Sequence, residues 1–287
     1  MQIPESELVL NADGSAYHLH LMPHQIAQNI IVVGDPDRVP KVSQFFDTIE
    51  HKIQKREFVT HTGTYKGKPL SVISSGIGTD NVEILMTELD ALVNIDLKKR
   101  ELKEKHTALN IIRIGTSGSL QDSVPLGSHL ISMYGIGLDT LMCFYELPQN
   151  RFENEVGKLL KETLTLPFQP YCVPCADALA KKFSVEMVKG VTATCCGFYA
   201  PQGRKIRNML KIPNLVGALS SFKLPESPNF QVTNFEMETA GYYAMGKILG
   251  HEMLSLNAII ANRISNKFHH SPEKCVNELI EKVLATI

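Results

Sequence analysis

The sequence Arg113-Ile-Gly-Thr-Ser-Gly-Ser119 contains the residue types best suited to chemistry, because an arginine lies inside an apolar run that a Gly/Thr/Ser segment follows. The run Ile111–Ile114 predicts a buried strand followed by a turn, and strand ends commonly form ligand crevices. A buried guanidinium needs an anionic partner. Arg113 either pairs with an internal carboxylate or binds an oxyanion together with the Thr116 and Ser117 hydroxyls, and we favour the oxyanion.

A second candidate anion site is Gly34-Asp-Pro-Asp-Arg38, directly after the apolar run Ile30–Val33. The glycine lets the backbone approach a ligand, and Arg38 offers several N–H donors. The same Gly-Asp-Pro sequence is also typical of an ordinary turn at a strand end. Both interpretations are open on these residues alone.

Two carboxylates lie close together in Asn234-Phe-Glu-Met-Glu-Thr-Ala240. Glu236 is placed to cap the helix that we expect to follow. Glu238 lies in an otherwise apolar segment and needs donors, such as the two adjacent hydroxyls of a ribose.

An aromatic ring, an amide and an arginine follow one another in Gly197-Phe-Tyr-Ala-Pro-Gln-Gly-Arg204. Stacking on Phe198 and edge contacts from Gln202 and Arg204 suit a planar heterocycle. On composition alone, a Pro/Gly loop with a solvated arginine is the better interpretation.

The elements that position these motifs alternate between strands and helices. Short β-branched runs predict buried strands: they are Ile30–Val33, Leu70–Ile73, Ile111–Ile114, His129–Ser132, Val188–Thr194 and Leu254–Ala261. Apolar residues at a helical period predict helices at Asn81–Val93 and Met237–Leu249. The alternation predicts an α/β sheet in one domain covering residues 1–287, with residues 1–16 as an N-terminal extension.

Two further segments have a distinctive composition. The charged stretch from Asp96 to His106 predicts a solvated helix extension or loop. The stretch from about Pro213 to Asn229, with its three prolines, predicts an extended loop, and loops of that length are often mobile lids.

Composition limits the possible classes. The chain has 287 residues, of which 44% are hydrophobic, and a net charge of -1, which fits a compact water-soluble protein and excludes a non-specific nucleic-acid binder. The absence of a long apolar stretch predicts no membrane span and, by default, a cytoplasmic location. The six cysteines predict reduced thiols, and the isolated pair Cys172 and Cys175 lacks the two further ligands of a zinc site, so we expect no metal there.

From about Tyr17 to the C-terminus, the chain resembles the nucleoside phosphorylases of the uridine phosphorylase and purine nucleoside phosphorylase type. The motifs that carry the resemblance are Gly-Asp-Pro-x-Arg, Arg-Glu-Phe, Ser-Gly-Ile-Gly, Arg-Ile-Gly-Thr-Ser-Gly and Glu-Met-Glu, beginning at Gly34, Arg56, Ser75, Arg113 and Glu236. The resemblance implies a single α/β domain with a central, mostly mixed β-sheet flanked by helices.

The resemblance also implies a role for each motif. Phosphate would contact Gly34, Arg38, Arg113 and Thr116, and Arg56 would reach it from a neighbouring subunit. The ribose would contact Met237 and Glu238, with His18 of a neighbouring subunit at the 5′-hydroxyl, while His20 stays structural. The base would contact Ser117, Gly118, Phe198, Gln202 and Arg204. The shared site implies a homo-oligomer, at least a dimer.

The activity implied is phosphorolysis of uridine, and of deoxyuridine as a further possibility, to uracil and the sugar 1-phosphate. Gln202 and Arg204 match the imide edge of uracil, and the strand end Ile259–Arg263 lacks the aspartate that purine-specific relatives carry near this position. Arg204, Gln202 and Arg113 would be catalytic. Inorganic phosphate is then the co-substrate, no cofactor is required, and a structural potassium ion is possible near Glu57, Ile77 and Asn81. A nucleosidase of the same fold and a non-catalytic nucleoside-binding protein are the alternatives.

Overall fold

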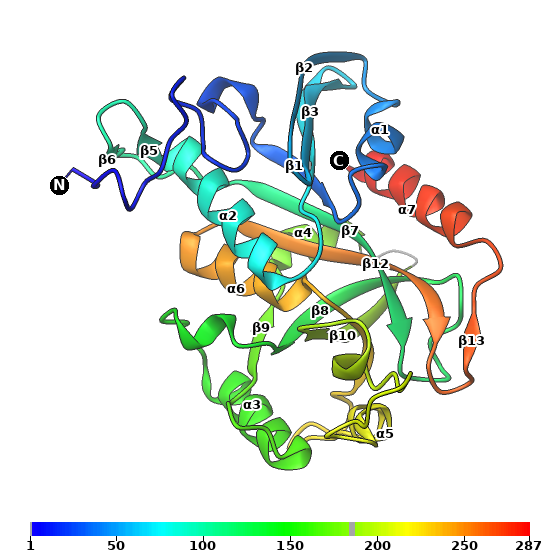
Figure 1. The fold of residues 1–287 in the computed structure, drawn as a ribbon. Helices are drawn as coiled ribbons and strands as arrows, with labels where there is room; N and C mark the ends of the chain where they lie inside the picture. The colour runs from blue at the N-terminus through cyan, green and yellow to red at the C-terminus, as the bar shows by residue number, and fades with distance from the viewer. Residues whose placement is uncertain (1, 184–186) are drawn as a thin grey trace. The chain divides into compact units, whose positions relative to one another are not determined.

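The computed structural model describes residues 2–183 and 187–287 (Figure 1). The chain divides into two compact units. The first comprises Met1–Arg113 and Met245–Glu252, and the second comprises Ile114–Ala244 and Met253–Ile287.

The first unit contains a sheet of mixed direction. Its strands are β1 (Asn29–Val33), β2 (Thr48–Lys55), β3 (Phe58–Tyr65) and β4 (Lys68–Ser74). Strand β1 pairs in parallel with β4, whereas β3 pairs antiparallel with both β4 and β2. Because β1 and β4 are parallel, the segments after Val33 and Ser74 leave the sheet at the same edge.

Two helices of the first unit follow these strands: α1 (Arg38–Ser43) and α2 (Thr79–Asn94). Helix α2 covers the predicted segment Asn81–Val93, which confirms the prediction from helical periodicity. The side chains at that period are fully buried at Val82, Leu85, Met86, Leu89 and Leu92. Gly78 precedes the helix at φ 94°, a conformation that a side chain would disfavour.

The second unit also contains a mixed sheet. Strand β7 (Asn110–Ser119) enters it from the first unit, and the other strands are β8 (His129–Leu138), β9 (Tyr171–Pro174), β10 (Val188–Cys195), β11 (Val232–Glu236), β12 (Glu252–Asn262) and β13 (Lys267–Phe268). Strand β10 is parallel to both β8 and β11, while β7 is antiparallel to β11, and β12 is antiparallel to β8.

The helices that accompany these strands are α3 (Arg151–Leu164), α4 (Asp177–Phe183), α5 (Leu215–Ser220), α6 (Thr239–Leu249) and α7 (Pro272–Thr286). A hydrophobic cluster joins α3 and α5 to β10 and β11, with Val156, Leu160, Leu219 and Val232 fully buried. Burying such side chains contributes roughly 1.5–3 kcal/mol each, so this cluster is a major source of the unit's stability.

The α/β class, the mixed sheet and the predicted strands are confirmed by these elements. The charged segment from Asp96 to His106 is not a helix extension: it includes β6 (Glu101–Leu102), which pairs with β5 (Ile95–Asp96) in a short hairpin. The Asp96 carboxylate shapes its turn by accepting the N–H groups of Lys98 and Lys99. The organisation in one domain, with an N-terminal extension, stays a prediction.

Two other expectations were made for the chain as a whole. The six cysteines are free thiols, as predicted. Among residues 2–183 and 187–287, none of the helices combines the length and the apolar character that a membrane crossing requires.

A buried carboxylate lies just after β8. Asp139 accepts the Tyr171 hydroxyl at 2.8 Å and the Leu141 N–H at 2.9 Å, and it is 3% exposed. Burial raises the pKa of Asp139 above its ordinary range, with a further contribution from the charge of Glu236. The native protein therefore holds a proton at this site at pH values where the unfolded chain, with a carboxyl pKa of about 3.9, has lost it.

We expect the stability of the wild type to fall, relative to an Asp139→Asn variant, as the pH rises from 4 to 8. A raised native pKa means that the unfolded state binds fewer protons in this window, so unfolding becomes easier as the pH increases. Urea unfolding at intervals of pH measures the difference between the two proteins, with the exposed Asp122→Asn as a control. A difference that stays constant, or that grows in favour of the wild type, would contradict the assignment.

Candidate functional site

The predicted base-binding residues of the second unit lie together. A short 3-10 turn, Ala200–Gln202, bends the chain so that Arg204 folds back over Phe198, with its guanidinium carbon 3.8 Å from the ring centroid. The Arg204 Nη1 donates to the Gln202 Oε1 at 2.6 Å and to the Phe198 carbonyl at 2.6 Å. The three residues, which the resemblance implies would contact the base, therefore form one polar and aromatic cluster.

Two residues complete this cluster that the motif Phe198–Arg204 does not include. Arg263, after the end of β12, donates from Nη1 to the Gln202 carbonyl at 2.9 Å. Its guanidinium carbon and that of Arg204 lie 5.4 and 5.9 Å from the centroid of the Phe235 ring. The sequence signal for Arg263 is a cation directly after a buried strand.

This cluster carries the positive charges of two guanidinium groups. Partial burial and the neighbouring charge of Arg263 lower the pKa of Arg204 to about 10, and partial burial also lowers the pKa of Arg263. Both side chains stay positively charged at neutral pH. Two guanidinium groups held beside one aromatic ring and one amide suit a planar ligand that is rich in electrons or that gains negative charge.

The Gly/Thr/Ser segment borders the same cluster but is not a turn. Strand β7 continues to Ser119, because Gly118 and Ser119 pair with Phe235 and Asn234 of β11. A Cβ atom on Gly118 would lie 3.2 Å from the Phe235 ring, so the absence of a side chain keeps this approach open. Since side chains alternate along a strand, Thr116 lies on the same face of β7 as Gly118.

The Ser117 side chain, on the opposite face, is engaged within the protein. Asn234 donates from Nδ2 to the Ser117 hydroxyl at 3.0 Å, and Thr192 donates to the Asn234 Oδ1 at 3.0 Å. The Ser117 hydroxyl therefore belongs to a buried polar network rather than to the Phe235 face. We expect any contact of Ser117 with a base or an anion to come from its backbone.

The carboxylate pair of the Glu-Met-Glu motif divides into two roles. Glu236 accepts the backbone N–H groups of Glu238 and Thr239 at 2.9 Å and the Thr194 hydroxyl at 2.7 Å. It therefore caps α6, which begins at Thr239 and not at Met237 as periodicity predicted. By holding the Glu238 N–H, this cap fixes the backbone of the two predicted ribose contacts, half-buried Met237 and buried Glu238.

The first unit contains the predicted phosphate residues Gly34, Arg38 and Arg113. Gly34 follows β1, and a Cβ atom there would lie 3.4 Å from the carbonyl oxygen of Gly76, which follows β4. Arg38 begins α1 and is half-buried, whereas Arg113 is 4% exposed within β7. Both glycine motifs thus lie at one edge of the parallel pair, where ligand crevices commonly form.

Arg56 lies in the turn that connects β2 with β3. Strands β2 and β3 pair Lys55 with Phe58, so Arg56 and Glu57 form a two-residue hairpin turn. Arg56 is exposed and has φ 54°. An exposed arginine at the tip of a hairpin is placed to extend away from its own sheet.

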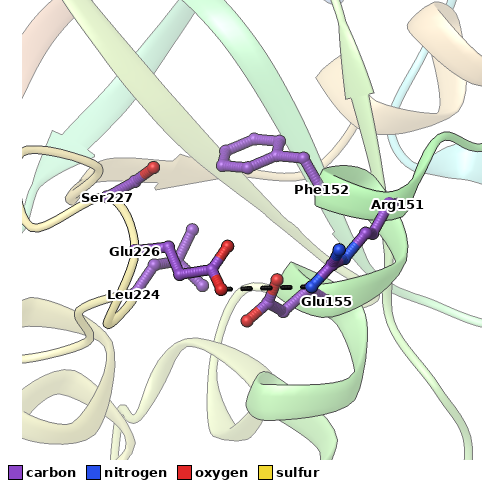
Figure 2. A pocket seen from close by; sticks show the side chains of 6 residues that line it. All are labelled: Arg151, Phe152, Glu155, Leu224, Glu226 and Ser227. Carbon is purple, nitrogen blue, oxygen red and sulfur yellow. Dashed lines mark ion pairs between the residues drawn. The ribbon is translucent and has the colours of Figure 1, made fainter.

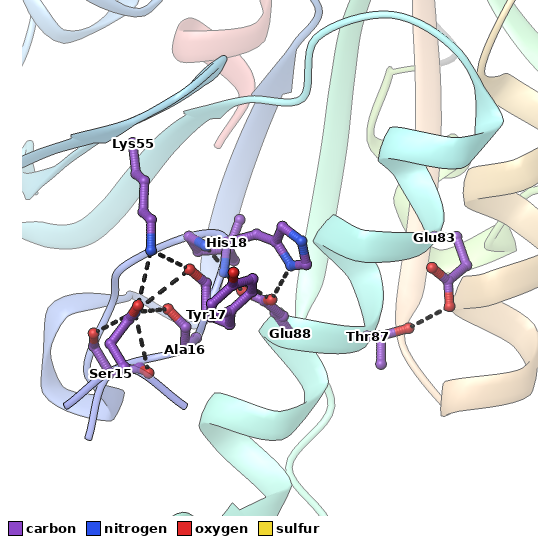
Figure 3. A network of polar contacts seen from close by, with 10 residues as sticks. Ser15, Ala16, Tyr17, His18, Lys55, Glu83, Thr87 and Glu88 are labelled. Carbon is purple, nitrogen blue, oxygen red and sulfur yellow. Dashed lines mark hydrogen bonds and ion pairs between the residues drawn. The ribbon is translucent and has the colours of Figure 1, made fainter. Parts of the chain in front are cut away.

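His18 of the same unit is held by a carboxylate. Its Nδ1 lies 2.6 Å from the Glu88 Oε1 of α2, and the backbone N–H of His18 also contacts Glu88 (Figure 3). His20 has a separate partner, since its Nε2 lies 3.1 Å from the Asp13 Oδ2. This agrees with a structural role for His20.

Two groups of side chains in the first unit contain atoms of the kinds that bind cations. The glycine turn before α2 brings Glu57 and Asn81 together, because a Cβ atom on Gly76 would lie within 3 Å of both side chains. These residues and Ile77, which is 70% exposed, are those for which the resemblance implied potassium, and the ion stays a prediction.

The second group is Asp90, His106 and His251, whose ligand atoms lie within 4.8 Å of one another. The Leu109 N–H donates to the His251 Nδ1 at 3.2 Å, so the proton of a neutral ring is on Nε2, which lies 3.3 Å from the Asp90 Oδ1. A nitrogen that carries a proton cannot coordinate a metal. The arrangement therefore favours a polar contact between Asp90 and His251.

A pocket of the second unit is lined by none of the predicted site residues. It has a volume of about 270 Å³ and is lined by Arg151, Phe152, Glu155, Leu224, Glu226 and Ser227 (Figure 2). The Arg151 Nη2 lies 4.0 Å from the Glu226 Oε1. The contact joins α3 to the segment from about Pro213 to Asn229, which was predicted as an extended loop. That segment in fact contains α5 and buries Leu215, Leu219 and Leu224. Those three anchors do not fit a lid that moves freely along its whole length.

Comparison with known proteins agrees with these motifs. The family model of the phosphorylase superfamily matches residues 29–286. A uridine phosphorylase of Thermococcus kodakarensis is 32% identical over 91% of this chain and 83% of its own length. A purine nucleoside phosphorylase of the DeoD type from Buchnera aphidicola is 24% identical over 95% of this chain and 99% of its own length.

A solved structure extends the similarity to the fold. The nucleoside phosphorylase of Trypanosoma brucei, described as showing uridine phosphorylase activity, superposes with a TM-score of 0.87 and 28% identity, covering 98% of this chain and 100% of its own. The family match spans nearly all of the described motifs. The chain therefore belongs to the phosphorylase superfamily and is a member of its nucleoside phosphorylase family.

Proposed function

We propose that this protein is a uridine phosphorylase, which cleaves uridine with inorganic phosphate to uracil and ribose 1-phosphate. The observation that carries the proposal is the cluster in which Arg204 and Arg263 lie over the Phe235 ring and both donate to Gln202. The similarity to uridine phosphorylases supports the proposal, whereas the purine nucleoside phosphorylases among the relatives make the base the point to be tested.

The polarity of the cluster fits the edge of uracil. The imide edge presents one N–H between two carbonyl oxygens. The Gln202 Oε1 already accepts from Arg204, but an amide oxygen has a second lone pair for the imide N–H. Its own amide group and the two guanidinium groups can then donate to the carbonyl oxygens, so each group of the ligand edge meets a complementary partner.

The same polarity fits the reaction. When phosphate attacks C1′, the N-glycosidic bond breaks and its electron pair moves onto the base. Positively charged donors aimed at the carbonyl oxygens stabilise this charge as it develops, and such preorganised donors are usually the largest catalytic contribution. Phosphate is already an anionic nucleophile, so Gly34, Arg38, Arg113 and Thr116 need only bind and orient it.

The functional unit proposed is a homo-oligomer, at least a dimer, in which Arg56 and His18 complete a neighbouring subunit's site. The exposed hairpin tip of Arg56 supports this role. The proposed location is the cytoplasm, where the free thiols would stay reduced.

The experiment that tests the function is uracil release from uridine, with and without inorganic phosphate, and with inosine as a parallel substrate. We expect uracil and ribose 1-phosphate only when phosphate is present, and no cleavage of inosine. Release without phosphate would indicate a nucleosidase, cleavage of inosine would indicate a purine enzyme, and binding without release would indicate a non-catalytic protein.

We expect Arg204→Ala to lower kcat for uridine by about 100-fold, the loss typical of one charge-stabilising donor. Because Arg204 also holds the Gln202 amide at 2.6 Å, KM should rise as well, though by a smaller factor. Steady-state kinetics measure both constants. Arg207→Ala is a matched control, since Arg207 is an exposed arginine of the same loop. An unchanged kcat in Arg204→Ala would exclude its catalytic role.

We expect Arg56→Ala and Arg204→Ala subunits to restore activity when they are unfolded and refolded together. If Arg56 acts in a neighbouring subunit, a mixed pair contains one site with both arginines, so roughly a quarter of the wild-type sites return in a random mixture of symmetric dimers. Activity of the mixture is compared with that of each variant refolded alone. A mixture no more active than its components would contradict the shared site.

A further inference from the structure

The segment that carries His18 is closed into a compact loop by Asn11. The Asn11 Nδ2 donates to the Ala16 carbonyl at 2.7 Å and to the Ser15 hydroxyl at 2.9 Å. Its Oδ1 accepts from the Lys55 Nζ at 2.8 Å. Both ends of one amide are therefore used to shape the chain just before His18.

Lys55 connects this loop to the β2–β3 hairpin. Its Nζ donates to the Tyr17 carbonyl at 2.6 Å and lies 4.8 Å from the centroid of the Tyr17 ring. Tyr17 immediately precedes His18, and Lys55 immediately precedes Arg56. The contact between Lys55 and Tyr17 therefore restrains the chain directly beside both residues that are proposed to act in a neighbouring subunit.

Glu88 of α2 holds His18 from the other side. Its Oε1 lies 2.6 Å from the His18 Nδ1 and accepts the His18 N–H at 2.9 Å, while its Oε2 accepts the Leu19 N–H at 2.8 Å. The Glu88 side chain is 15% exposed. Both carboxylate oxygens are therefore committed to the backbone or the ring of the segment His18–Leu19, and none of the contacts described for Glu88 serves another element.

We propose that Glu88 is a positioning residue that fixes the ring orientation and the protonated nitrogen of His18. This inference rests on the proposed function, in which His18 meets the 5′-hydroxyl of the nucleoside. An ionised carboxylate only accepts hydrogen bonds, so Nδ1 carries a proton and Nε2 is the nitrogen presented outward. Glu88 thereby determines whether His18 accepts or donates the hydrogen bond at the 5′-hydroxyl, without itself touching the substrate.

Glu88→Gln tests this role because it changes the polarity with little change of shape. The glutamine oxygen can still accept the backbone N–H groups of His18 and Leu19 if its amide nitrogen faces the His18 ring. That nitrogen then donates to Nδ1, and the ring proton of the neutral form moves to Nε2. Nitrogen NMR of the histidine rings in the substrate-free protein distinguishes the two forms, with His18→Ala identifying the resonance.

The kinetic test compares uridine with 5′-deoxyuridine, which lacks the hydroxyl. We expect Glu88→Gln to lower kcat/KM for uridine by about tenfold, the effect of one hydrogen bond lost, and to change kcat/KM for 5′-deoxyuridine by less than about twofold. His18→Ala should show the same selectivity, and adding Glu88→Gln to it should cause no further loss. Glu83→Gln, on the same helix, is the matched control (Figure 3).

Each outcome bears on a distinct claim. Equal losses with both substrates would mean that Glu88 only supports the fold, and a His18 ring protonated on the same nitrogen in both proteins would also overturn the proposal. A wild-type protein that releases no uracil would refute the proposed function. The NMR comparison needs no turnover, so it would still decide whether Glu88 sets the protonation of His18.

Discussion

The contact of two guanidinium groups with a single aromatic ring is the constraint around which the second unit's candidate site is arranged. Like charges repel, and partial burial removes some of the water that would screen them. The lowered pKa of Arg204 records both costs. The arrangement persists because each guanidinium also donates to the Gln202 residue and lies against the Phe235 ring. The remaining N–H groups of the two guanidinium groups can donate to an anionic ligand, whose charge would offset their mutual repulsion.

The neighbouring strands β7 and β11 leave room for the ring and the two guanidinium groups. Phe235 can lie beneath the two cations because Gly118, opposite it on β7, has no side chain. Alternation along β11 then places Asn234 and Glu236 on the other face, where they hold Ser117 and the start of α6. One strand therefore supplies the ring of the proposed base site from one face and the supports of the proposed ribose contacts from the other. A one-residue shift in the pairing of β7 with β11 would exchange these roles, so the register itself is part of the site.

Much of this arrangement could be predicted from local signals. The β-branched runs gave the central strands, and Glu236 was recognisable as a cap from its place before an apolar helical period. The resemblance, rather than a local pattern, implied that Phe198, Gln202 and Arg204 act together, and their side chains are in contact. By contrast, the continuation of β7 through Thr116 to Ser119 depends on its pairing with β11, which lies more than a hundred residues later, and no local pattern records it. The same long separation hid Arg263, because only the fold brings the end of β12 to Gln202.

Glu88 illustrates a second reason why sequence patterns are incomplete. Glutamate is common in helices, so its presence in α2 indicates no particular role. Its partner, His18, lies 70 residues away in the sequence. Its meaning comes from geometry: one carboxylate accepts two consecutive backbone N–H groups and a ring nitrogen. Lys55 and Asn11 restrain the preceding residues in the same way, and Lys55 is joined directly to Arg56. If Arg56 and His18 both serve a neighbouring site, binding phosphate and binding the sugar would each favour the same placement of this loop and hairpin. Order gained by one contact need not be lost again for the other, which is a physical reason for the two residues to share an anchor.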